Sequence, residues 1–155
     1  MNIEDLLFNY PLLASVSASL ISQVIKVIIA SIRNKKLRLD RFIQTGGMPS
    51  SHSAMAMALV TSIVLQEGIK SVYFAIGVPF ALVVLYDAGG IRRYAGMQAK
   101  MINQIKKDLE IKEMGNNENN DDKLLKELIG HTPMEVVGGS VIGVLLALLL
   151  GWFYV

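Results

Sequence analysis

The chain has no cysteine and is poor in charged residues. Of its 155 residues, 18% are charged and 52% are apolar, whereas soluble domains carry roughly 25% charged residues. The lack of cysteine excludes disulfides, zinc–thiolate sites and a cysteine nucleophile. A net charge of +2 is too small for a protein that binds nucleic acid by neutralising phosphates. These absences argue against an ordinary soluble domain and against a DNA or RNA partner.

The chain contains several long apolar runs. Residues 12–32 contain one ionisable side chain, that of Lys26, and are long enough to cross a hydrocarbon core of about 30 Å. Residues 136–155 form a second uncharged run. Between them, residues 54–65 and 69–86 predict a helical hairpin whose shorter first arm either spans the membrane or re-enters it. We therefore expect an all-α integral membrane bundle of about four transmembrane helices.

Lysine and arginine are concentrated in two segments. Residues 33–41 hold five of them and residues 87–133 hold eight. By the positive-inside rule both segments are cytoplasmic, with both termini on the opposite side. In the longer segment, apolar residues within 91–109 recur at helical spacing, which predicts an amphipathic helix along the cytoplasmic membrane surface. A mobile polar loop is expected at about 112–122, within a single membrane-embedded domain of residues 1–155.

Two cations share one face of the first apolar helix. Lys26 lies about two turns from its cytoplasmic end, where an uncompensated cation costs up to ~3 kcal/mol. Arg33 follows seven residues later and so lies on nearly the same face. Two stacked cations at the membrane boundary suit a phosphate group. A lysine that snorkels toward the headgroups explains Lys26 equally well.

A segment with the sequence GGMPSSHS precedes the second apolar run. Ser50 and Ser51 are placed to cap the coming helix, whose N-terminal N–H groups form an anion site. The glycines let the backbone approach a ligand closely, and His52 would stand beside a bound anion as a proton donor. A plain helix cap with an interfacial histidine is the alternative.

His131 and Glu135 precede the last apolar run. Their spacing of four makes them neighbours on a helix, and a carboxylate beside an imidazole prepares the histidine to act as a nucleophile or base. A helix cap in which Glu135 favours the positive helix end is the alternative. The chain has two histidines, and the expected topology brings both to the boundary where Arg92 and Arg93 also lie. This set suits metal-free phosphoryl transfer, since the cations would repel a metal ion.

These residues are similar to the motifs of a known family. The chain resembles the type 2 phosphatidic acid phosphatase superfamily, in particular its small divergent branch, related to acid phosphatases and vanadium-dependent haloperoxidases. Residues 26–33 have the spacing of the motif KxxxxxxRP, with Asn34 in place of proline. Residues 49–52 (PSSH) are similar to PSGH, and residues 131–135 are similar to the end of SRxxxxxHxxxD, with glutamate in place of aspartate.

The arginine of the third motif is displaced in this chain. Leu125 stands six residues before His131, where the family has arginine. Arg92 begins a stretch similar to the family's RxYxGxH sequence, with Gln98 at the histidine position. We infer that an insertion splits the motif and that Arg92 supplies its arginine, with Arg93 as the alternative.

The resemblance implies hydrolysis through a phosphohistidine. His131 would attack phosphorus while Glu135 holds its other ring nitrogen, and His52 would protonate the departing oxygen. Neither a metal nor a cofactor is implied. The substrate phosphate would be held by cations and by the helix-capping serines: Lys26, Arg33, Ser50, Ser51, Arg92 and Arg93.

A site at the membrane boundary suits a phosphorylated membrane lipid: phosphatidate, phosphatidylglycerophosphate, or an isoprenoid phosphate or diphosphate. The expected protein is a multi-pass lipid phosphatase of the cell membrane with a cytoplasmic active site, and a homo-oligomer is compatible with its broad apolar surface. Two alternatives stay open. One is a non-hydrolytic binder or translocator of lipid phosphates, and the other is a structural membrane protein with interfacial histidines.

Overall fold

The computed structural model describes residues 8–38, 42, 46–108, 125 and 130–155. The polar loop expected at about 112–122 lies outside them. Within the described residues the regular structure is entirely helical, in the order α2 (Tyr10–Asn34), α3 (Ser51–Glu67), α4 (Val72–Tyr86), the π-helical turn η2 (Asp87–Ile91), α5 (Arg92–Asp108) and α6 (Pro133–Tyr154). The prediction of an all-α membrane bundle is confirmed.

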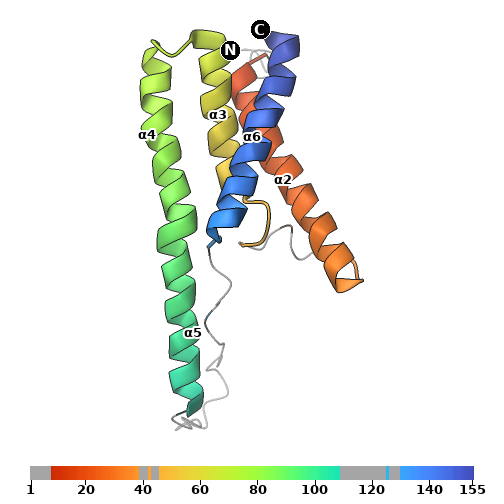
Figure 1. Cartoon of the computed structure of the whole chain (residues 1–155), viewed down its shortest axis with the longest axis vertical. Helices are drawn as coiled ribbons and strands as arrows, with labels where there is room; N and C mark the ends of the chain where they lie inside the picture. The colour runs from red at the N-terminus through yellow and green to blue at the C-terminus, as the bar shows by residue number, and fades with distance from the viewer. Residues whose placement is uncertain (1–7, 39–41, 43–45, 109–124, 126–129) are drawn as a thin grey trace, which may run out of the picture.

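α3 contacts each of the other bundle helices, α2, α4 and α6, and α2 also packs on α6 (Figure 1). Three helical stretches of the described chain are long and apolar enough to cross a membrane: residues 10–34, 72–107 and 133–154. α3 is shorter, with 17 residues. The start of α2 and the end of α6 lie at one end of the bundle, whereas α3 and α6 begin at the other end (Figure 1). The two histidines, which lie at these two helix starts, are therefore brought to the same end.

Each bundle helix begins at a polar side chain that accepts a backbone N–H. Asn9 caps α2 and Ser71 caps α4, while Ser50 and Thr132 cap α3 and α6. The caps satisfy N–H groups that have no acceptor within the helix. As a result α3 and α6 each begin three residues before the apolar run that follows them.

Small side chains line the contacts between the helices. Every fourth residue of α2 is buried along one face: Tyr10, Ala14, Ala18, Ser22 and Lys26. The corresponding row on α6 consists of Gly139, Gly143, Ala147 and Gly151. A Cβ atom on Gly139 would lie 2.2 Å from the carbonyl oxygen of Ser50, and one on Gly143 would lie 2.2 Å from that of Ala54. α3 and α6 are therefore in backbone contact, which small residues permit in membranes.

The segment after α4 differs from the expectation of a separate surface helix. An amphipathic helix is present at Arg92–Asp108, but α4, η2 and α5 form one continuous helix that extends beyond the starts of α3 and α6 (Figure 1). The helix continues because the Asp87 N–H bonds to Val83 and Val84 and the Arg92 N–H bonds to Asp87. The amphipathic helix was predicted correctly but its continuity with α4 was not, because the change from apolar to charged residues marks a change of surroundings and not the end of a helix.

Candidate active site

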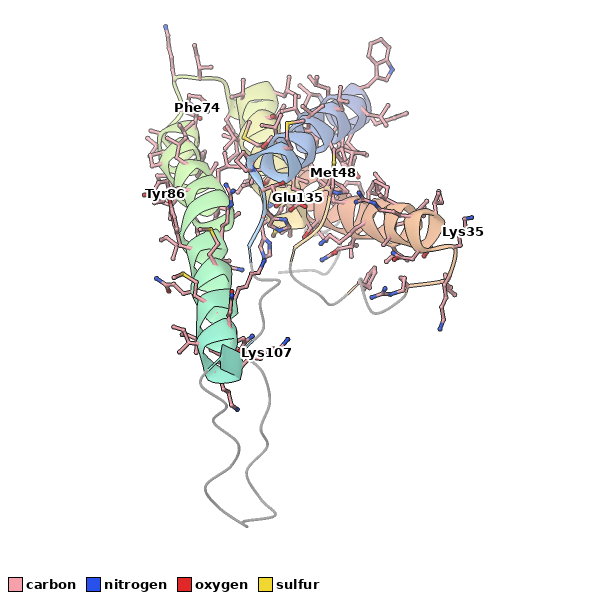
Figure 2. The ribbon with its side chains drawn as sticks, turned by 60° about the horizontal axis from the view of Figure 1, so that its bottom comes forward. Lys35, Met48, Phe74, Tyr86, Lys107 and Glu135 are labelled. Atoms are coloured by element: carbon pink, nitrogen blue, oxygen red, sulfur yellow. The ribbon has the colours of Figure 1, made fainter. Side chains whose placement is uncertain are left out.

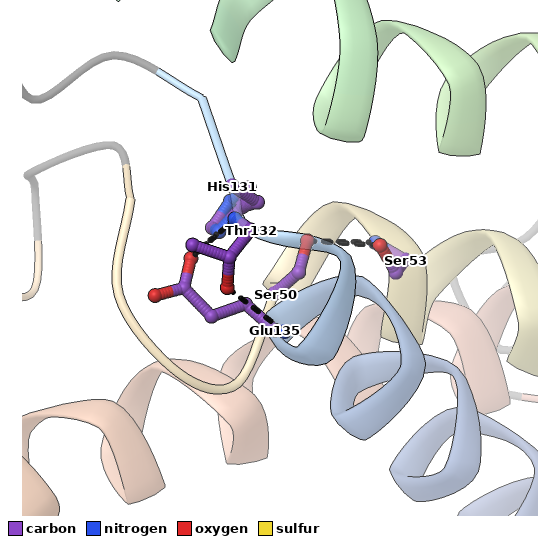
Figure 3. A network of polar contacts seen from close by, with 5 residues as sticks. All are labelled: Ser50, Ser53, His131, Thr132 and Glu135. Atoms are coloured by element: carbon purple, nitrogen blue, oxygen red, sulfur yellow. Dashed lines mark hydrogen bonds and ion pairs between the residues drawn. The ribbon is translucent and has the colours of Figure 1, made fainter.

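The glycine loop before α3 leads into the end of the bundle where the histidines lie. Gly46 and Gly47 adopt left-handed φ angles of 92° and 90°, which other residues rarely tolerate. Ser50 is buried, and its Oγ accepts the N–H (3.3 Å) and the hydroxyl (2.9 Å) of Ser53. The Ser50 N–H donates to the carbonyl of Glu135 (3.0 Å). Ser50 thus joins the start of α3 to the start of α6 (Figure 3).

The N-terminus of α3 retains N–H groups for an anion. Ser51 and His52 are the first two residues of α3, and their N–H groups have no acceptor within the helix. Ser51 is buried, whereas His52 is exposed. Because the Ser50 N–H is bonded to Glu135, an anion at this helix end would be held by the N–H groups of Ser51 and His52.

His131 is held against the backbone of η2 and α5. Gly130, at φ +87°, lies so close to α5 that a Cβ there would be 2.3 Å from the Arg93 nitrogen. The N–H of His131 donates to the carbonyl of Ala88 (2.9 Å). The whole residue is 3% exposed. The position of the imidazole is therefore fixed by its own backbone as well as by its side-chain contacts.

Glu135 both caps α6 and contacts His131. Its Oε2 lies 3.1 Å from Nδ1 of His131 and accepts the N–H of Thr132, also at 3.1 Å. The Thr132 hydroxyl accepts the N–H of Glu135 in return, which completes a capping box (Figure 3). The two interpretations of Glu135, cap and histidine partner, are thus compatible. The same Glu135 side chain thus serves the capping box and the contact with His131.

The two imidazoles face each other across a short gap. The ring centroids of His52 and His131 are 6.4 Å apart, and the ring planes are inclined by 62°. Reacting groups in a productive complex lie about 3–3.5 Å from the atoms they attack. The two rings are therefore close enough for one phosphoryl group to contact both.

Two cations act on this pair. Lys26 is 3% exposed, and its Cγ and Cδ lie 3.6 and 3.7 Å from the place where Gly47 would carry a Cβ. Its charge acts on both imidazoles, and that of Arg92 acts on His52. Arg92 also forms an ion pair with Asp87 (Nε to Oδ2, 2.5 Å). Positive charge from Lys26 therefore acts on both histidines, and that from Arg92 acts on His52.

The other two predicted cations lie apart from the histidines. Arg33 is exposed in the last turn of α2, and that end of α2, marked by Lys35, lies away from the start of α6, marked by Glu135 (Figure 2). Arg93 is exposed and lines a groove between α4, α5 and α6. The structure thus brings Lys26 and Arg92 to the site and leaves Arg33 and Arg93 outside it.

Burial lowers the pKa of the His131 imidazole below its ordinary value, and the Lys26 charge lowers it further. The hydrogen bond and charge of Glu135 and the backbone of Gly47 raise that pKa without reversing the direction. The neutral imidazole, which a nucleophile requires, is therefore the favoured form at neutral pH.

Asp87 is a site residue that the motif search did not find. It orients Arg92 through their ion pair, and its charge also acts on His52. Two side chains five residues apart do not lie together on an α-helix, so helical spacing did not predict the contact of Asp87 with Arg92. The π-helical turn, with its i to i+5 bonding, brings them together.

Known proteins are similar to this chain over nearly its whole length. The membrane protein YuiD of Bacillus subtilis (strain 168) is 44% identical over 156 residues, which covers 97% of this chain and 99% of that protein. No solved structure matches. The model of the Divergent PAP2 family matches residues 7–146, which include both histidines and every cation discussed above. The resemblance inferred from three short motifs is confirmed, and the chain belongs to the Divergent PAP2 family.

Proposed function

We propose that the protein is a metal-independent lipid phosphatase, which hydrolyses a lipid phosphomonoester or an isoprenoid phosphate or diphosphate through a phosphohistidine. One observation carries the proposal. A buried His131 is bonded to Glu135 at 3.1 Å and faces His52 with ring centroids 6.4 Å apart. Buried lysine and ion-paired arginine charges act on the same pair.

In the first step Nε2 of His131 attacks phosphorus and the bond from phosphorus to the lipid oxygen breaks. His52 donates its proton to that oxygen, so the lipid leaves as an alcohol. Glu135 accepts the hydrogen bond from Nδ1–H and stabilises the positive charge that develops on the ring.

In the second step water attacks phosphorus, His52 takes the proton of that water, and the bond from phosphorus to nitrogen breaks. Inorganic phosphate leaves and His131 is regenerated. Throughout, Lys26, Arg92 and the N–H groups of Ser51 and His52 stabilise the charge on the phosphoryl oxygens.

Phosphate release by the purified protein tests the proposal. We expect release from phosphatidate, phosphatidylglycerophosphate or an isoprenoid phosphate in detergent micelles, unaffected by a chelator and inhibited by vanadate, which mimics pentacoordinate phosphorus. Binding of these lipids without turnover of any of them would instead support a non-hydrolytic lipid-phosphate binder.

Glu135→Gln separates the catalytic from the capping role. Glutamine completes a capping box, but it lacks the charge that raises the pKa of His131. We expect the rate to fall by about 10²-fold or more, as when the orienting carboxylate of a catalytic histidine is removed. The acid limb of the pH profile of kcat/KM should move to lower pH, because the pKa of His131 falls further. A purely structural role would lower thermal stability and leave the acid limb in place.

The cytoplasmic orientation of the site is tested by cysteine labelling, which has no background because the chain lacks cysteine. Lys70 and Lys107 are exposed and lie near opposite ends of the continuous helix formed by α4, η2 and α5. We expect a membrane-impermeant maleimide to label Lys70→Cys in intact cells and Lys107→Cys only after permeabilisation. The reverse pattern would place the site on the outer face.

A further inference from the structure

A groove of about 550 Å³ lies beside the histidine site, between the long helix and the start of α6. Its volume is within the range of about 300–1,000 Å³ that is typical of small-ligand sites. Tyr86, Gly90, Tyr94 and Met97 form one wall, and Pro133, Val136 and Val137 belong to the other. The groove is open at Gly90, which has no side chain. A Cβ atom there would project into open space, with the Tyr86 ring, at 4.0 Å, as its one near neighbour.

The groove spans the change from apolar to polar surroundings. Arg93 is the one charged side chain among the described residues that line it. Tyr86 and Tyr94 also line the groove, and tyrosines settle at the headgroup level of membranes. Val83 of α4 and Val141 of α6 lie about one helical turn from the lining residues Tyr86 and Val137, and both are apolar and exposed. An occupant with a hydrocarbon chain and an anionic group matches this arrangement.

Residues that line the groove are also close neighbours in the chain of residues in the site. Pro133 and Val136 lie in the same helical turn as Glu135. Arg93, which lines the groove, contacts Gly130 through its backbone, and Gly130 precedes His131. A lipid lying in the groove would therefore have its headgroup beside the histidine pair.

We propose that this groove binds the hydrocarbon chain of a lipid phosphate, with Arg93 contacting an anionic oxygen of its headgroup. The inference rests on the proposed function for what happens to the phosphate, but chain binding itself does not require turnover. The occupant comes from the membrane and not from water, because nearly all residues that line the groove are apolar or aromatic and the adjoining helices α4 and α6 carry further exposed apolar side chains.

Photolabelling tests the groove independently of catalysis. The probe is phosphatidate with a diazirine near the end of one acyl chain, in phosphatidylcholine nanodiscs, with His131→Ala protein so that the probe is not consumed. We expect the label on the apolar side of Arg93, at residues 82–90 and 136–141. Gly90→Leu, which fills the groove, should reduce it about tenfold, the effect of losing burial of roughly two methylene groups. Ala75→Leu adds three carbon atoms, against four in Gly90→Leu, at an exposed position of α4 and should leave the label unchanged.

Arg93→Gln gives a second test that keeps the groove open. We expect labelling by the phosphatidate probe to fall to the level of a diacylglycerol probe, which lacks the phosphate. The proposal that the groove binds the lipid chain would be overturned if the label were confined to α2 and α3. It would also be overturned if the Gly90→Leu and Ala75→Leu proteins were labelled equally. Lack of turnover by the unmodified protein would refute the phosphatase while the labelling still decides whether the groove binds lipid.

Discussion

Replacing His131 with alanine is expected to lower phosphate release by at least about 10³-fold, since covalent catalysis fails without its nucleophile. The residue is buried, its backbone is bonded to Ala88, and its ring contacts Glu135. The measurement uses a lipid labelled with ³²P at the phosphomonoester, and the acid-labile label on the protein should disappear together with turnover.

His52→Gln is the matched comparison for His131→Ala. It removes the proposed acid and should slow lipid hydrolysis by about 10²–10⁴-fold. It should still form the labelled intermediate, and it should lose less activity on p-nitrophenyl phosphate, whose leaving group needs no proton. Retention of more than a tenth of the activity by a folded His131→Ala protein would contradict the phosphohistidine mechanism.

The second large effect is expected from Gly143→Ala, which adds a single methyl group in the middle of α6. That methyl group would lie 2.2 Å from the carbonyl oxygen of Ala54, and a backbone carbonyl in α3 has little freedom to move. We expect a loss of about 3 kcal/mol or more in the free energy of unfolding, at the upper end of overpacking effects. Thermal unfolding in detergent measures it.

Gly138→Ala is the control on the same helix. Its methyl group meets the end of the flexible Met48 side chain, at 3.1 Å, so the change in stability should be below about 1 kcal/mol. If the Gly143→Ala and Gly138→Ala proteins unfold at the same temperature, α3 and α6 are not in the backbone contact described above.

The helices could be predicted where composition alone defines them. The apolar runs at 12–32 and 136–155 coincide with α2 and, to within one residue, with α6, because a membrane requires about twenty apolar residues per span. The continuation of α4 into α5 could not be predicted in this way. A π-helical turn leaves no compositional signature, and the glycines in it are equally typical of a loop.

The candidate site shows the same division between local and long-range information. The contact of Glu135 with His131 and the cap formed by Ser50 both depend on residues three or four apart, and the structure contains both. The position of Arg33 depends on how α2 leans relative to its neighbours. Although Lys26 and Arg33 share a helix face, only the Lys26 end of that face is packed within the bundle.

The five-residue π turn of η2 also sets the rotational phase of the helix that follows it. Each residue of an α-helix advances the chain by about 100°, and a π turn takes up one residue more than the turn it replaces. An unbroken α-helix of the same sequence would carry Arg92 round to the direction that Arg93 now has and would put Ile91 in its place. Loss of one residue within 87–91, with return to α-helical winding, would keep both arginines in their present directions. This turn is therefore a place where the chain can change length by one residue without reorienting the side chains on either side.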